Sequence, residues 1–503
     1  MTPVTKIRKV VFPVLPPLLR VHENDSVAVA LGGLAAGTSA LGITLLQDVP
    51  QGHKVALQAH RHGARVIKYG QPIGIASADI AAGEHVHSHN LVTALSGELA
   101  YSYSAGRVTA RVFPDAPTWR GYRRGDGRAA TRNEVWILPT VGCVGQSAQQ
   151  VASAARQRHG PAAASVHAFT HPHGCSQLGD DLAGTRALLA GIAANPNAAG
   201  VLLLGLGCES NQLDALMEEV PEAARGKLRV LSSQSVGDEL AAAGALVDEL
   251  VGEAQSARRE DLPLSALTVG LKCGGSDALS GLTANPLLGR FSDDLCAAGG
   301  RAILTEIPEI FGAEQTLLDR APSAQIFVSA ADLVNRFKCH YLEQGLPVSE
   351  NPSPGNLAGG ITTLEEKSLG AVQKGGNAPL VDVIDYGGQA GKAGLTLLEA
   401  PGNDAVSASA LAAAGATLIL FTTGRGTPLG FPVPTIKIAS NQALAEAKPH
   451  WIDFDASCTL HAGSEAADRA FLERIIAIAS GEECAAERAD QRAMAIWKRG
   501  VTL

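Results

Sequence analysis

Residues 20–92 carry short runs in which apolar and polar positions alternate, and Gly, Asp and Pro residues separate these runs. The segments SVAVAL, HKVAL, RVIKYG and EHVHSHN follow this pattern. Alternation with a period of two is typical of strands that bury one face, and this region has no helical period. The pattern therefore predicts a small all-β domain over residues 20–92.

The pattern changes after residue 92. Residues 93–120 are polar and have no clear period, which predicts a linker. From residue 121 onwards, continuous apolar segments such as EVWILPTVGC, AGVLLLGLGC and ATLILFTTGRG alternate with helical patterns. Apolar strands that alternate with helices are the signature of a buried parallel sheet. We expect a multidomain α/β chain whose α/β part divides near Leu262, into residues 121–261 and 262–503, with a Pro-rich extension at 1–19.

Composition narrows the class of protein. The chain has 503 residues, of which 46% are hydrophobic and 18% charged, so it can form a large core. Its net charge of −8 argues against nucleic acid as the main partner. Eight cysteines are too few for a disulfide scaffold and predict free thiols in the reducing cytoplasm. No apolar run reaches the roughly 20 residues that span a bilayer, so we expect no membrane association.

Four cysteines follow a glycine or lie at the end of an apolar strand. Cys143, Cys208 and Cys273 end the strand-like runs TVGC, LGLGC and GLKC, and Cys175 lies in HPHGCSQLGDD. The carboxyl ends of parallel strands form the ligand crevice of an open α/β sheet. The thiols are therefore either metal-binding thiolates or small side chains that pack beside glycine. No CxxC pair is present, which excludes a zinc ribbon.

Histidines gather in two segments. His171 and His173 lie two residues apart in HPHGCSQLGDD, where carboxylates also occur, and imidazole with carboxylate suits non-haem iron. The alternative is a polar turn in which the Asp pair begins a helix. In EHVHSHN, His85, His87 and His89 would face one way on a strand, which indicates ligation or proton transfer; an exposed His-rich edge is the alternative.

The stretch LKCGGSDALSGLTANPLLG is dense in reactive and hydrogen-bonding side chains, and we expect a helix to begin within it near Ser280. Lys272 beside Cys273 suits a base or a carboxylate anchor. Glu306 follows another strand, which suits a metal ligand or general base, and Arg425 in FTTGRGTPLG can grip a carboxylate with two hydrogen bonds. The patterns of a P-loop and of a full dinucleotide-binding loop are absent. Residues 351–376 predict a polar loop that leads into a helix and acts as a lid.

Taken in order, several of these segments resemble one family. QGHKVAL, VIKYGQPIG, GEHVHSHN, HPHGCSQLGDD, GLKCGGSDALSGLTANPLLG, TEIPEIFGAE and TGRGTPLGFPVPTIKIASN are similar to the altronate/galactarate dehydratases over about residues 20 to 460. The resemblance implies an N-terminal SAF (β-clip) domain, Rossmann-like α/β domains and a homodimer. It implies loss of water from a sugar acid, with Fe²⁺ or Mn²⁺. GEHVHSHN and VIKYGQPIG favour the altronate branch, whose product is 2-dehydro-3-deoxy-D-gluconate, over the galactarate branch and the related sulfolactate sulfo-lyases.

The resemblance and the residue chemistry together predict a site. The expected metal ligands are His171, His173, Cys175, Cys143, Cys208 and Cys273. The expected catalytic residues are Lys272, Glu306, His53 and His87, the two histidines being presented by a closing β domain. The expected substrate-binding residues are Asp277, Asn285, Thr423, Arg425 and Asn441. Two other classes stay open: an aconitase-like enzyme with an iron–sulfur cluster on three of the Gly-Cys thiolates, and a sugar-acid-binding protein without activity.

Overall fold

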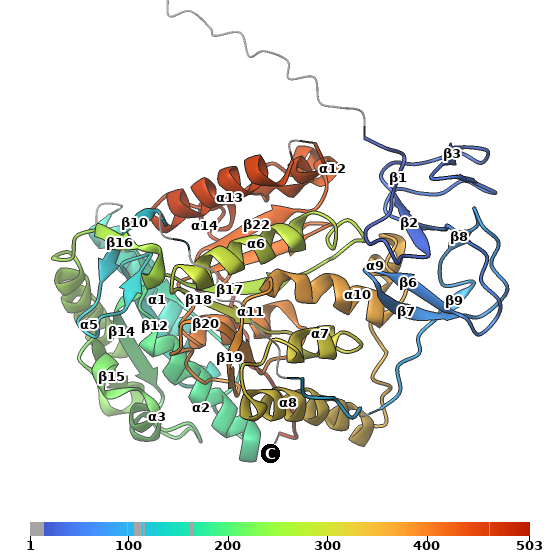
Figure 1. Ribbon diagram of the computed structural model, residues 1–503. Helices are drawn as coiled ribbons and strands as arrows, with labels where there is room; N and C mark the ends of the chain where they lie inside the picture. Colours follow the sequence, from blue (N-terminus) through green and yellow to red (C-terminus); the bar gives the residue numbers. More distant parts are fainter. Residues whose placement is uncertain are drawn as a thin grey trace, which may run out of the picture.

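The computed structural model describes residues 15–97, 99–104, 113, 116–160, 165–461 and 463–502. Figure 1 shows a small N-terminal strand domain beside two larger α/β bodies that carry the middle and C-terminal parts of the chain. This confirms the predicted multidomain α/β class with an all-β N-terminal domain. Most of residues 1–19 lie outside the described residues, so the predicted extension is not placed.

The N-terminal domain, hereafter the β-clip domain, contains only strands within residues 15–97. One antiparallel sheet has the order β1-β2-β5-β8 and another the order β6-β7-β9. The strands are β1 (Leu18–Leu19), β2 (Val27–Ala30), β3 (Ser39–Ala40), β4 (Ile43–Thr44), β5 (Lys54–Ala56), β6 (Arg65–Lys68), β7 (Gln71–Ala76), β8 (His85–Val86) and β9 (Leu91–Val92). Val66 and Ile73 belong to the same buried cluster as Leu369 of the C-terminal domain, so the two domains share a core.

The middle domain is built on a parallel sheet with the order β13-β12-β14-β15. Its strands are β12 (Glu134–Pro139), β13 (Val166–Ala168), β14 (Ala198–Gly205) and β15 (Leu228–Ser232). Helices α1 (Gly145–His159) and α5 (Glu239–Ala254) pack on Ile137 and Leu202, whereas α2 (Gly179–Ala194) packs on Trp136 and Leu203. The remaining helices are α3 (Leu213–Glu219) and α4 (Glu222–Arg225). The unbroken apolar strands of the sequence are therefore buried on both faces, as predicted.

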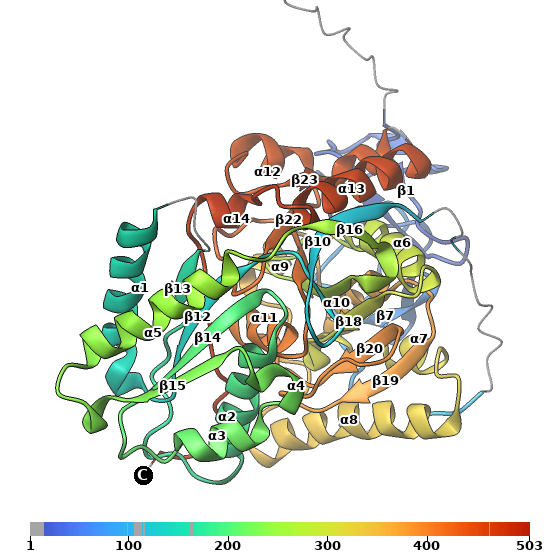
Figure 2. The same cartoon turned by 90° about the vertical axis from the view of Figure 1, so that its left-hand side faces the viewer.

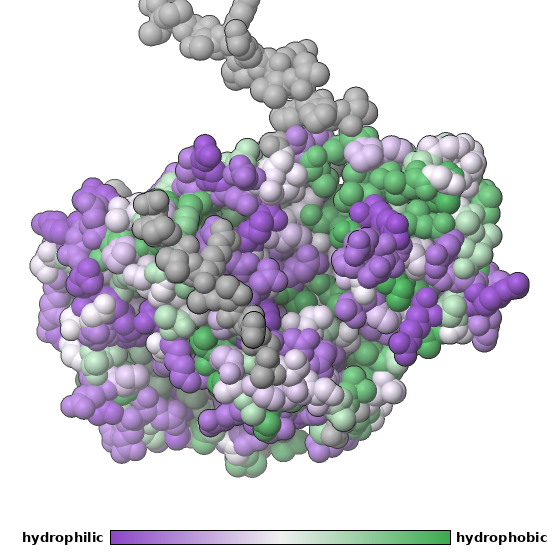
Figure 3. Space-filling model, viewed as in Figure 1, coloured by the Kyte–Doolittle hydropathy of each residue, from purple (hydrophilic) through white to green (hydrophobic). Residues whose placement is uncertain are grey.

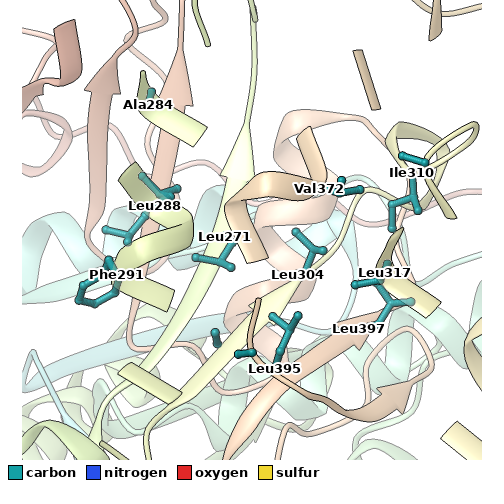
Figure 4. Close-up of a cluster of buried hydrophobic side chains, with 14 of the residues drawn as sticks. Leu271, Ala284, Leu288, Phe291, Leu304, Ile310, Leu317, Val372, Leu395 and Leu397 are labelled. Atoms are coloured by element: carbon teal, nitrogen blue, oxygen red, sulfur yellow. The ribbon is translucent and has the colours of Figure 1, made fainter. Parts of the chain in front are cut away.

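The C-terminal domain carries a seven-stranded parallel sheet with the order β19-β20-β18-β17-β21-β22-β23. Its strands are β17 (Thr268–Cys273), β18 (Arg301–Leu304), β19 (Leu380–Ile384), β20 (Gly394–Leu398), β21 (Leu418–Thr423), β22 (Thr435–Ala439) and β23 (Phe454–Asp455). Its helices are α6 (Ala284–Ala297), α7 (Glu314–Leu318), α8 (Ala324–Glu343), α9 (Pro354–Ala358), α10 (Leu364–Ala371), α11 (Asp404–Ala413), α12 (Gln442–Ala447), α13 (Ser464–Ala479) and α14 (Ala485–Arg488). Figure 4 shows the aliphatic core that holds β17 and β18 at Leu271 and Leu304.

The two α/β domains are joined through helices and through a short sheet. Asn195, just after α2, donates from Nδ2 to the carbonyls of Ala412 and Ala416 beside α11. Strand β10 (Thr118–Arg123) pairs with β11 (Ala129–Ala130) and with β16 (Glu260–Pro263) between the domains. In the turned view of Figure 2, β10 and β16 lie beside α6 and α13 of the C-terminal domain. Strand β10 begins inside residues 93–120, so the predicted linker ends earlier than expected.

Two further local expectations differ from the structure. The helix expected near Ser280 begins at Ala284, because Ser280 instead closes a turn by donating to Asp277. Residues 351–376 form α9, α10 and a 3-10 turn, and most of this segment after residue 360 is buried. The segment is therefore a packed part of the core, and the lid interpretation is wrong for it.

The surface separates polar and apolar regions. Figure 3 shows hydrophilic residues over much of this face, while apolar residues gather over the β-clip domain at the right. Leu41 and Leu46 of that domain are 53% and 58% exposed. Within the described residues, no helix is long and apolar enough to cross a membrane.

Candidate active site

The most highly charged part of the core lies at the carboxyl end of β17. This strand has β18 on one side and β21 on the other, so it stands where the strand order reverses, the usual ligand position in such sheets. Lys272 is fully buried and its Nζ donates to Glu306, to Asp404 Oδ1 at 2.9 Å and to the Cys273 carbonyl at 2.9 Å. Glu306 has φ +66°, a left-handed conformation that non-glycine residues seldom adopt. This backbone turn directs its carboxylate back to β17.

Cys273 is in contact with both carboxylates and with a second lysine. Its backbone N–H donates to Glu306 Oε2 at 3.0 Å, and its Sγ lies 3.1 Å from Glu309 Oε2. Lys374 Nζ donates to Cys273 Sγ at 2.7 Å and to Glu306 Oε2 at 3.3 Å. Lys367 Nζ lies 2.9 Å from Glu309 Oε1. The site is thus a buried network of three lysines, two glutamates and one thiol, which opens at Asp404.

The two glutamates have opposite pKa shifts. Burial and the nearby Glu309 raise the pKa of Glu306. Burial alone would also raise the pKa of Glu309, but Lys367 and Lys374 lower it to about 2. Burial, Glu306 and Glu309 raise the pKa of the Cys273 thiol. A pair of carboxyl groups whose environments separate their pKa values is the pattern of an acid–base site, in which Glu306 is the group suited to exchange a proton.

One group of described residues has the spacing of metal ligands. One ligand atom each from Cys273, Glu306 and Glu309 lies within 4.8 Å of the other two. Each of these ligands, however, already contacts a lysine ammonium, from Lys272, Lys374 or Lys367. A divalent cation placed among them would stand against three positive charges. The charges therefore do not fit a divalent ion here, and the lysines take the place of a metal in balancing the carboxylates.

A second buried charge cluster joins the β-clip domain to α10. Glu366 accepts from Lys54 and from Lys68, each at 2.8 Å, and all three side chains are almost fully buried. Lys54 Nζ also donates to the Gly360 carbonyl at 2.8 Å. Burial would raise the pKa of Glu366, but the two lysines lower it to about 2. Burial lowers the pKa of Lys54 to about 8, despite the attraction of Glu366.

The two clusters meet at a small cavity. Its lining comes from the β-clip domain, from the turn after β17 and from α10, and includes Lys68, Asp277, Asn285, Glu366 and Lys367. Because Glu366 and Lys367 are adjacent on α10, the cavity connects the cluster of the β-clip domain with that of the C-terminal domain. The residues around it therefore bring two domains to one polar site.

Three histidines of the β-clip domain stand against the segment before α10. His53 Nδ1 lies 3.0 Å from His85 Nε2, and the rings of His53 and His87 stack with centroids 5.0 Å apart. His53 and His87 reach the carbonyls of Ala358 and Leu357 with their Nε2 atoms. Burial and the neighbouring His53 and His87 lower the pKa of His85 to about 3. The rings of His87 and His89 both lie near that of His85, with centroids 5.5 and 5.6 Å away. The expected single strand is absent, because only His85 lies in a strand and His87 and His89 follow in a bend and a turn.

Most of the predicted substrate-binding side chains are engaged within the protein. Asp277 accepts from Ser280, Ser440 and Asn441, and Asn441 caps α12. Asn285 is buried between the Gly370 carbonyl and Thr422, and Thr423 Oγ1 accepts from the Gly426 N–H. These residues hold the loops around the cavity. Arg425 differs, because it is exposed and its side chain lies near Gly355 at the start of α9.

The predicted metal ligands are divided between two sheets. Cys273 lies in the C-terminal network, whereas Cys143, Cys175 and Cys208 are exposed at the carboxyl edge of the middle sheet. His171 Nε2 pairs with the Pro139 carbonyl at 2.8 Å, and its Nδ1 accepts from the His173 N–H, so neither ring nitrogen is free. Metal binding by the residues at the middle sheet stays a prediction, whereas the lysines around Cys273 do not fit a divalent ion there.

Five buried charged residues of the site were not anticipated: Lys54, Lys68, Glu366, Lys367 and Lys374. A signal was present, because HKVAL and VIKYG place a lysine inside apolar strands and LEEKSLGAVQKGG places charges in a helix with otherwise buried positions. A charged residue within a buried pattern needs a partner, and the partners are distant in sequence. Sequence spacing could not identify them.

Comparisons with known proteins agree with this architecture. Family models match residues 264–502 (D-galactarate/altronate dehydratase, C-terminal), 121–255 (D-galactarate dehydratase/altronate hydrolase, second domain) and 16–94 (altronate/galactarate dehydratase SAF domain). The chain belongs to the D-galactarate/altronate dehydratase family. This membership confirms the resemblance found in the sequence and identifies the chain as a hydro-lyase.

Relatives of known activity cover nearly the whole chain. An altronate dehydratase of Bacillus subtilis (strain 168) is 47% identical over 493 residues, which are 96% of this chain and 99% of that protein. An altronate dehydratase of Escherichia coli (strain K12) is 47% identical over 498 residues, again 96% and 99%. The galactarate dehydratase (L-threo-forming) of the same E. coli strain is 32% identical over 488 residues, 92% of this chain and 93% of that protein.

Proposed function

We propose that this dehydratase acts on D-altronate and forms 2-dehydro-3-deoxy-D-gluconate at the network around Lys272 and Glu306. The observation that supports the site is the buried carboxyl pair, Glu306 and Glu309, whose pKa values shift in opposite directions. The identity of 47% to altronate dehydratases, against 32% to the galactarate enzyme, supports altronate as the substrate. Galactarate and sulfonated hydroxy acids are the alternative substrates.

The charge of the two clusters suits an anionic substrate. Five lysines (Lys54, Lys68, Lys272, Lys367 and Lys374) face four carboxylates (Glu306, Glu309, Glu366 and Asp404), which leaves one positive charge in excess. A buried excess charge is costly unless it is paired. A sugar-acid carboxylate would pair it. Asp404 is the one partly exposed member, with 35% of its side chain accessible, and it marks the side from which the substrate approaches Lys272.

Elimination of water requires that a proton leaves the carbon beside the carboxylate and that the neighbouring hydroxyl is protonated. We assign proton removal to Glu306, whose raised pKa suits a group that takes up and returns a proton. Lys272 and Lys374 contact Glu306 and carry the positive charge that stabilises the enediolate. Glu309, with a pKa near 2, stays ionised and holds Lys367 in place.

The β-clip domain supplies the groups for the departing hydroxyl. Burial lowers the pKa values of His53 and His87, so neutral imidazoles face the last residues of α9. The proton taken by Glu306 must reach the leaving hydroxyl, and we assign its delivery to His53 or His87, which takes it up as a short-lived imidazolium whose lowered pKa makes it a strong acid. We assign Arg425 to the grip on the substrate carboxylate. Docking of this domain also covers the cavity, and exclusion of water strengthens each electrostatic contact inside it.

We further propose that the enzyme uses iron, in a homodimer that works in the reducing cytoplasm. All eight cysteines are free thiols in the structure, which suits a reducing compartment. Thiolate ligands favour iron over manganese, which prefers oxygen ligands. Because the lysine network does not fit a divalent cation, none of the proton-transfer steps above is assigned to a metal at that position.

The test begins with enzyme purified without oxygen and supplied with ferrous iron, which is offered D-altronate and galactarate in parallel. The readout is the 2-keto-3-deoxy acid. Product from D-altronate supports the proposal. Product from galactarate alone would show that the substrate is galactarate and not altronate. If neither acid reacts with an iron-loaded enzyme, the proposed substrate class is wrong and sulfonated hydroxy acids are tested next.

A further inference from the structure

We propose that Cys143, Cys175 and Cys208 together bind an iron–sulfur cluster at the carboxyl edge of the middle sheet. This deepens the proposed function, on which it rests for the need for iron, by naming the form and the place in which the iron is held. The site is separate from the lysine network of the C-terminal domain.

The three cysteines follow three neighbouring strands. In the order β13-β12-β14, β12 lies between the other two and pairs with both in parallel. Cys143 follows β12, Cys175 follows β13 and Cys208 follows β14. Parallel neighbours bring their carboxyl ends to one edge, and the strand order reverses at β12. The thiols therefore come from three adjacent loops at the position where this class of sheet binds ligands.

Hydrogen bonds connect the three loops in a closed set. The Gly142 N–H donates to the His173 carbonyl at 2.9 Å, which joins the first loop to the second. The Asn211 N–H donates to the Gly174 carbonyl at 3.0 Å, which joins the second loop to the third. Thr140 Oγ1 donates to Glu209 Oε1 at 2.5 Å, which joins the third loop to the first. Each contact lies within three residues of one of the cysteines, so the structure fixes their relative positions.

The glycine before Cys175 has no room for a side chain. Gly174 has φ +100°, and a Cβ there would stand 2.1 Å from the Thr140 carbonyl oxygen. Only glycine permits this approach of the second loop to the first. The Gly-Cys motif therefore has a structural reason at this position, namely to bring Cys175 close to the loop that carries Cys143.

Exposure distinguishes these three cysteines from the other five. Cys143, Cys175 and Cys208 are exposed, whereas Cys273 and Cys484 are buried and the remaining three are partly buried. Free cysteine is among the most buried residue types, because it packs as a small apolar side chain. Packing therefore does not account for three exposed thiols on neighbouring loops. Cys143 also lies in the turn that leads into the 15-residue helix α1, whose positive end favours a thiolate or an anionic cluster.

The three thiols are not arranged as the ligands of one ion. Among the described residues, the one set of three ligand atoms that lie within 4.8 Å of one another is that of Cys273, Glu306 and Glu309. The three exposed thiols therefore do not all lie within 4.8 Å of one another, as three ligands of one ion with metal–sulfur bonds of about 2.3 Å would. In a cluster each thiolate binds a different iron, so the sulfur atoms stand further apart.

The three cysteines would bind the proposed cluster through one Fe–S bond each. Each cysteine loses its proton and forms one Fe–S bond, so three irons of a four-iron cluster are held and the fourth has no cysteine from this set. His171 cannot serve as the fourth ligand, because both of its ring nitrogens are engaged. The fourth iron would then take its ligand from a group other than these three cysteines.

The experiment measures iron, acid-labile sulfide and the visible and electron paramagnetic resonance spectra of the full-length protein. The protein is purified without oxygen and reconstituted with ferrous iron and sulfide. We expect roughly four irons and four sulfides per chain, with a brown colour. Cys143→Ser, Cys175→Ser and Cys208→Ser should each lose most of the bound iron and sulfide. Cys458→Ser, which changes a partly buried cysteine of the C-terminal domain, is the matched control and should retain both. Because the three thiols are exposed, circular dichroism should show unchanged folding in every variant.

Two results would overturn the cluster. One is iron without sulfide that is lost in Cys273→Ser and retained in the other variants, which would place a single ion in the C-terminal network. The other is protein that binds no iron and sulfide after reconstitution and still dehydrates D-altronate, in which case the proposed function stands without the cluster. If the cluster forms and depends on all three thiols, but no sugar acid reacts, the cluster stands and the proposed substrate is wrong.

Discussion

Glu366 and Lys367 are neighbours on α10, yet their side chains enter two different buried clusters. Glu366 binds Lys54 and Lys68 of the β-clip domain, whereas Lys367 binds Glu309 of the C-terminal network. One turn of helix therefore ties the position of the β-clip domain to the position of an active-site carboxylate. A change on either side of this pair should affect both domain docking and the acid–base site.

The carboxyl pair can be tested with two matched substitutions. Glu306→Gln removes the proposed base, so we expect a fall in kcat of at least about 100-fold, whereas Glu309→Gln should change kcat much less. Each substitution takes the charged partner from a buried lysine, so each should also lower stability by roughly 3 kcal/mol. Steady-state kinetics and thermal unfolding measure the two effects. An equal loss of kcat in both variants would contradict the assignment of Glu306.

Glu366 should make unfolding dependent on acid. Its pKa in the folded protein is about 2, below the ordinary value of 4.5, so its stabilising effect is complete above pH 4.5 and declines as the pH falls towards 2. A difference of this size corresponds to roughly 3 kcal/mol at neutral pH. Chemical unfolding of the native protein and of Glu366→Gln should show a large difference at pH 7 that narrows below pH 4.5. A difference that stays constant with pH would refute the role of this ionised carboxylate.

The strands and the order of the domains were accessible from sequence because each depends on local pattern. Alternation in HKVAL and RVIKYG gives half-buried strands, and the unbroken apolar run of AGVLLLGLGC gives a strand that is covered on both faces. The start of α6 was placed too early, because Ser280 and Asp277 form a turn that depends on Ser440 and Asn441, more than 150 residues away. The spacing of residues near Ser280 cannot show contacts with residues so far away in the sequence.

The site was predictable only in part for the same reason. Lys272, Cys273 and Glu306 could be selected because they end strands, where side chains of parallel neighbours meet. Lys374 and Lys367 do not follow a strand, so the sequence pattern gave no reason to select them. Lys374 contacts Cys273, 101 residues away, and Lys367 contacts Glu309, 58 residues away. Asp277, Asn285 and Asn441 were selected as polar residues near the site, yet they hold loops. Polarity shows that a residue needs a partner but does not show whether that partner is substrate or protein.

The histidines of the β-clip domain should make the enzyme sensitive to mild acid. The pKa of His85 is about 3 in the folded protein against 6.5 ordinarily, because burial and the neighbouring rings oppose a charge. The lowered pKa of His85 has no effect on stability above pH 6.5. As the pH falls from 6.5 towards 3, the unfolded chain takes up a proton that the folded protein does not, and the folded state is progressively destabilised. His85→Gln should therefore flatten the fall of Tm between pH 6.5 and pH 5, whereas the exposed control His450→Gln should follow the native curve. Parallel curves for all three proteins would show that the histidine cluster does not set acid stability.

Arg425 should act on substrate affinity and leave the fold unaffected. It is exposed beside the start of α9, and no ion pair fixes its guanidinium among the described residues. Arg425→Ala should raise KM for the sugar acid by about tenfold or more, because a charge-assisted contact to the carboxylate is lost, with a much smaller change in kcat and no change in Tm. Arg425→Lys keeps the charge but not the planar pair of donors, so it should recover only part of the affinity. Arg123→Ala, which removes an exposed arginine that pairs with Glu260 on β16, is the control and should leave KM unchanged. If Arg425→Ala has the native KM, the substrate carboxylate is held elsewhere, and the buried lysines around Glu306 become the first candidates for that contact.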